Sequence, residues 1–129
     1  MEKALRAYLI ADATLSGLID TRLAWGVNDQ GAIMPRVTLQ KISGAPEYSD
    51  EGEAQLGQAR VQVDCFAATY AGAIAIARAI RERVSGENFT QDDVTFDVFI
   101  DAERDDFEPG EGGREIYRYS MDLIVWHNA

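Results

Sequence analysis

Residues 58–86 read QARVQVDCFAATYAGAIAIARAIRERVSG, and this stretch decides the fold. Val61, Val63 and Cys65 alternate with polar residues, which is the pattern of a strand with one buried face. The period then changes to that of an amphipathic helix, with apolar residues at positions i, i+3, i+4 and i+7. The predicted buried stripe of this helix consists of Tyr70, Ala73, Ile74, Ala77, Ile80 and Val84. Both elements must bury an apolar face, so the rest of the chain is expected to complete a sandwich around them.

The ends of this helix carry capping residues. Thr69 is placed to cap its start, because a threonine hydroxyl accepts a hydrogen bond from a backbone N–H of the first turn. Ser85 and Gly86 are expected to end it, with Gly86 in the left-handed conformation. Cys65 is the one cysteine of the chain, so it cannot form an internal disulfide. We expect it to be a small buried core residue rather than a reactive or metal-binding thiol.

Two short helices are predicted at the N-terminal end. The first spans residues 2–11, and Asp12 or Thr14 would cap a second one that continues to Ile19. Helices this short are marginal on their own in water, so both must dock on a sheet.

Four further segments have strand patterns. Residues 21–25 are a candidate short strand, and residues 36–43 form a longer one after Pro35. Alternation predicts a long strand over residues 94–102 and a last strand over residues 116–126. One loop separates the last two strands, so they should pair as an unusually long antiparallel hairpin whose ends extend beyond the core.

These elements predict a single domain, residues 1–129, of the α+β class. The expected architecture is an antiparallel sheet of about four strands with a long hairpin. One face would be covered by the central helix and the short N-terminal helices. No apolar run reaches the roughly 18 to 20 residues of a membrane helix, and the charged N-terminus is unlike a signal peptide. We therefore expect synthesis in the cytoplasm and no membrane partner.

Two segments without any period, 44–57 and 105–113, are predicted to be long irregular loops. Both are rich in glycine, proline and acids, and each is interpreted as a mobile arm or a functional loop that becomes ordered on contact with a partner. Tyr48 and Phe107 are their large aromatic residues and would anchor the docked loops. The candidate interaction residues are Tyr48, Asp50, Glu51, Glu53, Asp105, Asp106, Phe107, Glu108 and Glu111.

The net charge of −10 is unevenly distributed along the chain. Residues 87–115 contain eleven acids and two arginines, so this region carries most of the net charge. Binding to nucleic acid depends on Lys and Arg displacing counterions from phosphates, so direct, tight DNA binding is not expected. The plainest interpretation of the region is a solvated acidic face that keeps the protein soluble.

The sequence contains no recognisable catalytic or cofactor motif. His127, the one histidine, lies next to the C-terminus and is expected to be exposed, so no Ser/His/Asp or Cys/His set is available. The acid pairs 92–93 and 105–106 lack the spacing of a calcium loop, and no aromatic motif supports a glycosidase-type carboxylate pair. We therefore predict no enzyme, no metal site and no cofactor. An interaction protein remains, either a ring or tube subunit or a monomeric adaptor.

The order and spacing of the elements resemble the tail-terminator or tail-completion proteins of long-tailed phages and phage-like gene transfer agents. The matching features are the first helix (4–9), the segment 12–19, the strand entry MPRVTL (34–39), RVQVDCF (60–66) with its Ala-rich helix, and RYSMDL (118–123). They cover most of residues 4–84 and part of the last strand.

This resemblance implies a structural virion protein that forms a hexameric ring. The ring would cap the head-proximal end of the tail tube, end tube elongation and join the tail to a head-closure or connector protein. DNA would pass through the lumen without specific binding, and acids of residues 87–115 facing the lumen would keep it from adhering to the wall. The alternatives are another head–tail connector, of the head-closure or minor tail type, and a non-catalytic monomeric adaptor.

Overall fold

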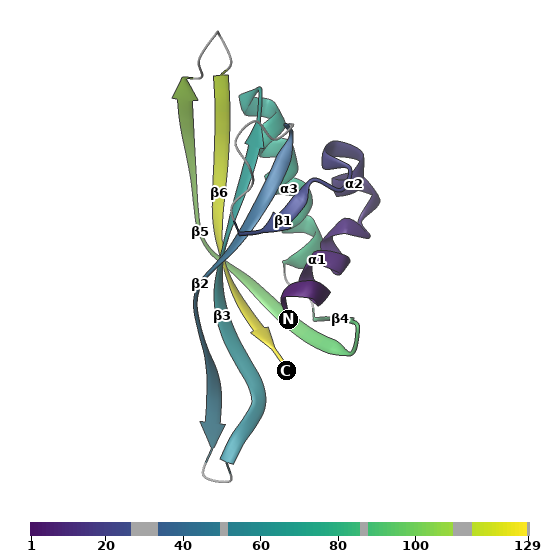
Figure 1. Ribbon diagram of the computed structural model, residues 1–129, viewed down its shortest axis with the longest axis vertical. Helices are drawn as coiled ribbons and strands as arrows, with labels where there is room; N and C mark the ends of the chain where they lie inside the picture. The colour runs from purple at the N-terminus through teal and green to yellow at the C-terminus, as the bar shows by residue number, and fades with distance from the viewer. Residues whose placement is uncertain (27–33, 50–51, 86–87, 110–114, 129) are drawn as a thin grey trace.

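The computed structural model describes residues 1–26, 34–49, 52–85, 88–109 and 115–128. In these residues, three helices pack on one side of a six-stranded sheet (Figure 1). The elements are α1 (Glu2–Ile10), α2 (Ala13–Ile19), β1 (Leu23–Trp25), β2 (Arg36–Ser49), β3 (Gly52–Ala67), α3 (Tyr70–Val84), β4 (Phe89–Gln91), β5 (Val94–Pro109) and β6 (Glu115–His127). The predicted mixture of helices with a largely antiparallel sheet is confirmed.

The predicted number of about four strands is wrong. The strand order is β1-β2-β3-β6-β5-β4, and all neighbours are antiparallel except β1 and β2. Both edges are three-residue strands, and β4 lies in a segment for which no strand was predicted. Phe89 of β4 stacks on Tyr8 of α1 at a centroid distance of 3.7 Å and on Phe96 of β5 at 5.0 Å. These contacts between distant segments hold β4 in place, and a local sequence pattern does not contain them.

The face of the sheet that the helices cover, called the inner face here, contains the core. Val61, Val63 and Cys65 are fully buried on it, as the alternation predicted. The buried residues of α3 are Ala73, Ile76, Ala77, Ala79, Ile80 and Val84. Ile76 thus takes the place predicted for Ile74, and Tyr70 is 48% exposed. Ile74 has helical spacing to Ala77, and Ile76 has helical spacing to Ala73 and Ile80, so only the packing against the sheet distinguishes them.

The helix starts agree with the predicted caps. The Thr69 hydroxyl of α3 accepts a hydrogen bond from the Gly72 N–H at 3.0 Å. The Asp12 carboxylate does the same for the Leu15 N–H of α2, also at 3.0 Å, so Asp12 rather than Thr14 is the cap. Ser85 follows α3 in an extended conformation, and Gly86 lies outside the described residues.

Both predicted irregular loops are largely strand. β2 and β3 stay paired as far as Ser49 and Gly52, and β5 and β6 as far as Pro109 and Glu115. β1 pairs with β2 only at residues 37–39, and β6 pairs with β3 only at residues 57–67. In the described chain the outermost parts of both hairpins are therefore paired as two strands only, without the third strand that supports the centre of the sheet.

These hairpin ends project from opposite ends of the molecule (Figure 1). We call residues 44–49 and 52–57 the β2–β3 arm, and residues 102–109 and 115–120 the β5–β6 arm. The C-terminal hairpin is long, as predicted, and its described residues end close to the start of α3, while a second arm at the other end was not predicted as a hairpin.

A β-bulge at Asp101 changes the faces of β5. Ile100 lies opposite Leu123 and Ala102 opposite Asp122, so Asp101 is the extra residue. Beyond the bulge Glu103, Asp105 and Phe107 therefore lie on the inner face, opposite Met121, Tyr119 and Tyr117. Glu103 is paired there with Arg81 of α3, so an ion pair links the helix to the base of the β5–β6 arm.

Candidate interaction surfaces

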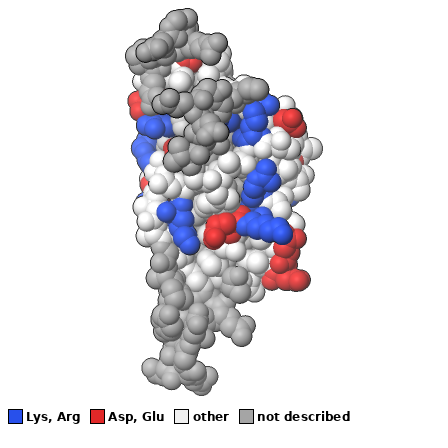
Figure 2. Space-filling model, viewed as in Figure 1, with Lys and Arg blue, Asp and Glu red and all other residues white. Residues whose placement is uncertain are grey.

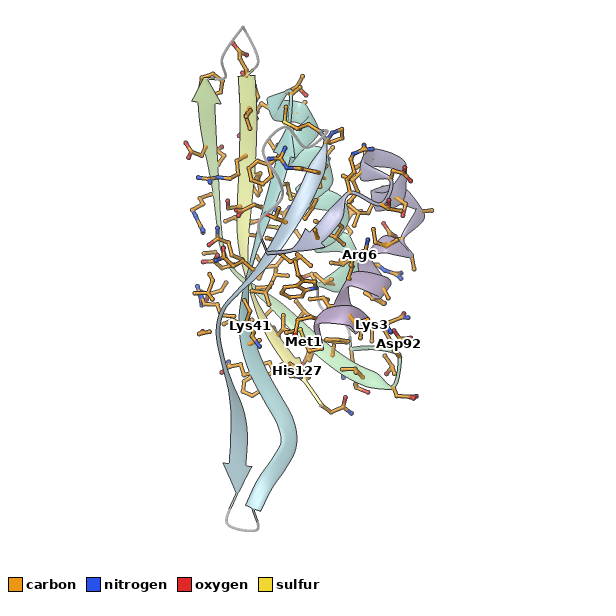
Figure 3. All side chains as sticks on the ribbon, in the orientation of Figure 1. Met1, Lys3, Arg6, Lys41, Asp92 and His127 are labelled. Atoms are coloured by element: carbon orange, nitrogen blue, oxygen red, sulfur yellow. The ribbon has the colours of Figure 1, made fainter. Side chains whose placement is uncertain are left out.

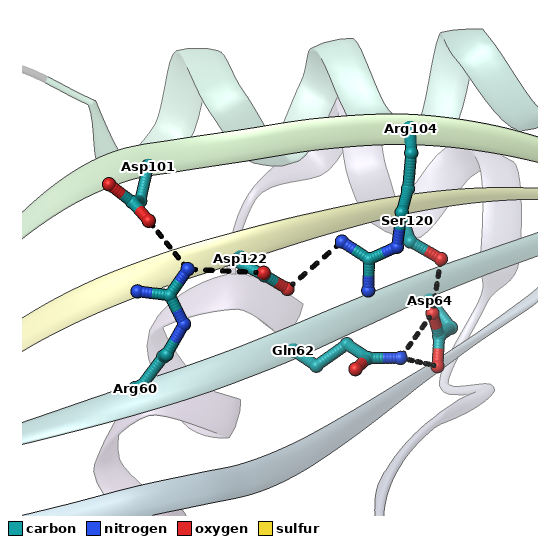
Figure 4. A network of polar contacts seen from close by, with 7 residues as sticks. All are labelled: Arg60, Gln62, Asp64, Asp101, Arg104, Ser120 and Asp122. Atoms are coloured by element: carbon teal, nitrogen blue, oxygen red, sulfur yellow. Dashed lines mark hydrogen bonds and ion pairs between the residues drawn. The ribbon is translucent and has the colours of Figure 1, made fainter.

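The outer face of the sheet, away from the helices, carries a network of ion pairs across three strands (Figure 4). Asp122 of β6 accepts hydrogen bonds from Arg60 of β3 at 3.2 Å and from Arg104 of β5 at 3.3 Å. Arg60 also donates to Asp101 at the bulge, and this bond raises the pKa of the Arg60 guanidinium, with Asp122 acting in the same direction. Several acids of the 87–115 region are therefore neutralised by arginines rather than forming a uniformly acidic face.

Asp64 is a buried carboxylate on the same outer face, 8% exposed. It accepts a hydrogen bond from the Ser120 hydroxyl at 2.5 Å and from the Gln62 side-chain amide at 3.1 Å. Ser120 is itself only 3% exposed. Because a buried carboxylate is tolerated only where its oxygens have donors, this arrangement joins β3 to β6 and is interpreted as structural.

An aromatic cluster lies on the inner face of the β5–β6 arm. Tyr70 at the start of α3, Phe107 of β5 and Tyr117 of β6 meet there, with Tyr117 in the centre. The ring centroids of Tyr117 and Phe107 are 4.9 Å apart, and those of Tyr117 and Tyr70 are 6.2 Å apart. Tyr70 is 48% and Phe107 45% exposed, so the cluster continues the inner face beyond the part that α3 covers.

Carboxylates border this cluster. The Tyr70 hydroxyl donates to Asp105 at 2.7 Å, and this hydrogen bond raises the pKa of Tyr70. The Tyr117 hydroxyl donates to Glu115 at 3.3 Å, and its pKa is raised first by burial and then by the nearby Glu115 charge. Both phenols therefore remain neutral at physiological pH. We call Tyr70, Phe107, Tyr117, Asp105 and Glu115 the aromatic tip.

The structure brings together only part of the predicted interaction set. Asp105, Asp106 and Phe107 lie on one arm, and Asp106 is paired with Arg118 at 2.8 Å. The side chains of Tyr48, Glu53 and Glu108, and the whole of Asp50, Glu51 and Glu111, lie outside the described residues. Sequence reasoning missed Tyr70, because it assigned this residue to the buried stripe of the helix, and it named no interaction residue in the last strand, where Tyr117 lies. The position of Tyr70 at the start of its stripe was the one available signal.

A basic surface extends over α1 and the neighbouring strands β1 and β2. It is formed by Lys3 and Arg6 of α1, Arg22 before β1, and Lys41 of β2, and we call it the basic face. Figure 2 shows Lys and Arg side chains spread over α1, β1 and β2, and Figure 3 labels Lys3, Arg6 and Lys41 there. Arg6 donates to the Leu23 carbonyl at 2.9 Å and Arg22 to the Pro35 carbonyl at 2.7 Å. Among the described residues, none of these four cations is within 4.0 Å of a carboxylate oxygen.

His127 is not the exposed terminal residue that the sequence suggested. It is partly buried at the end of β6, opposite Gly57, where an added Cβ would lie 3.1 Å from the imidazole Cε1. Burial lowers the pKa of His127, and the positive charge of Lys41 acts in the same direction. β6 stays paired with β3 as far as His127, and this register places the imidazole of His127 against the sheet.

Catalytic and metal chemistry finds little support in the described part of the chain. No group of three or more His, Cys, Asp or Glu side chains is arranged there to hold a metal ion. Cys65 is fully buried, as predicted, and burial raises the pKa of its thiol. No helix among the described residues is both long enough and apolar enough to span a membrane.

Comparisons with known proteins point in one direction. A model of the protein family described as "Tail completion protein gp17" matches residues 3–128. A solved structure, "Virion of native gene transfer agent (GTA) particle", contains a chain with the same fold. The TM-score is 0.77 at 17% sequence identity, and the match covers 100% of this chain and 95% of that chain. A comparison with curated proteins found no match.

Proposed function

This chain belongs to the family of the tail completion protein gp17, and on that premise we propose that it is the subunit of a ring that caps the tail tube. A tail completion protein is a virion component, and the place of this protein is the tail of a phage or phage-like particle. We further propose that the ring sits at the head-proximal end of the tube, ends the elongation of the tube and joins the tail to the head-completion complex.

The observation that carries the proposal is the pair of free strand edges. β1 covers the outer edge of β2 only at residues 37–39, and β4 covers that of β5 only at residues 94–96. In the described chain, residues 40–49 and 99–109 therefore have no neighbouring strand on their outer side. Long unpaired edges are binding sites for other chains. Because these edges lie at opposite ends of one subunit, they favour heterologous contacts, which close into rings.

The proposed partners follow from this arrangement. Copies of the chain, six in the resemblance, form the ring, while the tail tube protein and a head-closure or connector protein contact its two sides. DNA passes through the lumen without specific binding. The outer face of the sheet suits such a wall, because Arg60, Arg104 and Arg118 are engaged with carboxylates and Arg36 lies over the Phe66 ring, so this positive charge is partly occupied within the subunit. A non-catalytic role agrees with a family of structural tail proteins.

The test is removal of the protein from the particle that contains it. Without the protein, we expect tails of irregular length that fail to join heads, and restoring the wild-type chain should restore particles. Electron microscopy of labelled wild-type particles should place a ring of this protein between the tube and the head. A signal on the head side of a complete tube would identify another type of head–tail connector. Normal tailed particles in its absence would refute the proposal.

A further inference from the structure

Among the described residues, two surfaces lack a partner of opposite charge, and they match each other. We propose that the aromatic tip of one copy binds the basic face of the next copy, so that the subunits contact one another head to tail. This inference rests on the proposed ring and names the contact that closes it.

The aromatic tip has the composition of a site for cationic side chains. The faces of Tyr70, Phe107 and Tyr117 attract guanidinium and ammonium groups, and such contacts become stronger when solvent is excluded. Asp105 and Glu115 supply charge beside the rings, and neither forms an ion pair with a cation among the described residues. Tyrosine and arginine are also the residues that dominate binding energy at protein interfaces.

The basic face presents the complementary groups. The bonds of Arg6 and Arg22 to backbone carbonyls hold each guanidinium in place while leaving other N–H groups free to donate. Lys3 and Lys41 are exposed and extend the positive surface on either side. Acids also lie on this surface, since Glu2 is exposed and Figure 3 labels Asp92 close to Lys3, but the four cations form no ion pair among the described residues. An acidic aromatic partner is therefore favoured over a basic or purely apolar one.

The shape of the molecule makes the contact intermolecular. The β5–β6 arm projects from one end of the molecule, whereas α1 and Lys41 lie near its middle (Figures 1 and 3). The tip of one copy therefore cannot reach its own basic face. Each copy offers one tip and one face, which is the arrangement that a closed ring of identical subunits requires.

A charge-exchange experiment tests this contact. A face variant carries Lys3→Glu and Lys41→Glu, and a tip variant carries Asp105→Lys and Glu115→Lys. All four side chains are exposed, so folding is expected to persist and is verified by circular dichroism. In low salt and at high protein concentration, sedimentation should show association of the wild type and none of either variant alone. An equal mixture of the two variants should associate again, because every tip then meets a face of opposite charge.

Matched variants separate the aromatic contribution from general effects. Phe107→Ala should weaken self-association by roughly tenfold or more, as expected for an interface hot spot. Ile124→Ala is the control, since Ile124 is a partly exposed residue on the outer face of β6, which has a strand on each side. Arg78→Glu, at an exposed position of α3 away from the basic face, controls for the change in net charge. Both controls should associate like the wild type.

Several outcomes would overturn the inference. They are a wild type that stays monomeric in low salt, single-surface variants that associate normally, or a mixture that fails to recover. These outcomes are distinct from failure of the proposed function. If particles built from either charge variant still contain the ring, the proposed function stands and the contact between tip and face is refuted. If the protein is absent from particles, the proposed function is refuted, and sedimentation still decides whether the two surfaces bind each other.

Discussion

In the centre of the molecule the helices cover the inner face of the sheet and bury its apolar side chains, whereas the β2–β3 arm extends beyond the helical layer and the β5–β6 arm contacts it through α3. The central strands show clear alternation in sequence and the arms show little. The same backbone pairing therefore has two different supports, which are side-chain burial in the centre and backbone hydrogen bonds in the arms. Stability is expected to reside in the first region and assembly in the second.

The largest effect on stability is expected in the central region. Leu123 of β6 is fully buried in the core. Leu123→Ala removes buried methylene groups and leaves a cavity, which should lower the free energy of unfolding by about 2–5 kcal/mol. Denaturant unfolding followed by circular dichroism measures this change. The matched variant Phe107→Ala, in the arm, should change stability far less. Equal losses in the two variants would show that the arm belongs to the folding core.

A smaller effect is expected for the polar outer face. Asp64→Ala leaves the buried Ser120 hydroxyl without its acceptor, so it should cost about 1–3 kcal/mol. The double variant Asp64→Ala, Ser120→Ala should cost less than the sum of the single variants, because the unsatisfied group is removed. Asp97→Ala serves as the control, because Asp97 lies on the same face and its side chain forms no hydrogen bond or ion pair among the described residues. Additive losses from Asp64 and Ser120 would contradict the coupling.

The contrast between centre and arms also explains how far the sequence could predict the fold. The strand and helix in residues 58–86 were predictable because each buries one face and the burial leaves a period. The arms were interpreted as irregular loops because pairing without burial leaves none. β4 was missed because it has three residues and depends on stacking between Phe89 and Tyr8, which are far apart in sequence.

The candidate surface was predicted in part for a related reason. Composition was enough to single out Asp105 and Phe107 in an acidic, glycine-rich stretch. The bulge at Asp101 then decides on which side of the sheet they lie, and nothing in the alternation of β5 reveals the extra residue. Tyr70 and Tyr117 become part of the same surface only through that change of face. The basic face was not predicted, since its four cations come from three separate elements.

A pH dependence is expected where His127 packs at the end of β6. The pKa of His127 is lowered in the folded protein relative to its ordinary value of 6.5. The unfolded chain therefore binds more protons as the pH falls through 6.5, so stability is present above this pH and declines below it. His127→Asn should remove this component of the decline. Unfolding curves at pH values on both sides of 6.5 measure it, and identical pH profiles for the two proteins would contradict the burial of the ring.

The smallest effect on stability, and the largest on assembly, is expected from shortening the arms. Replacing residues 45–56 by a two-residue turn removes a hairpin that no helix or third strand covers, so the melting temperature should hardly change. Removing residues 106–114 from the β5–β6 arm takes away Phe107 and the edge next to it. Both arms are already paired strands in the isolated subunit, so what a deletion removes is the surface that the arm offers to a partner. Each deletion should therefore abolish or weaken particle assembly while the isolated subunit stays folded.

The measurements are thermal unfolding and the yield of tailed particles, with Leu123→Ala as the control that lowers stability without altering an arm. If a deletion unfolds the subunit, the arm belongs to the folding core. If particles form at the normal yield, the arm only connects two strands and has no role in assembly.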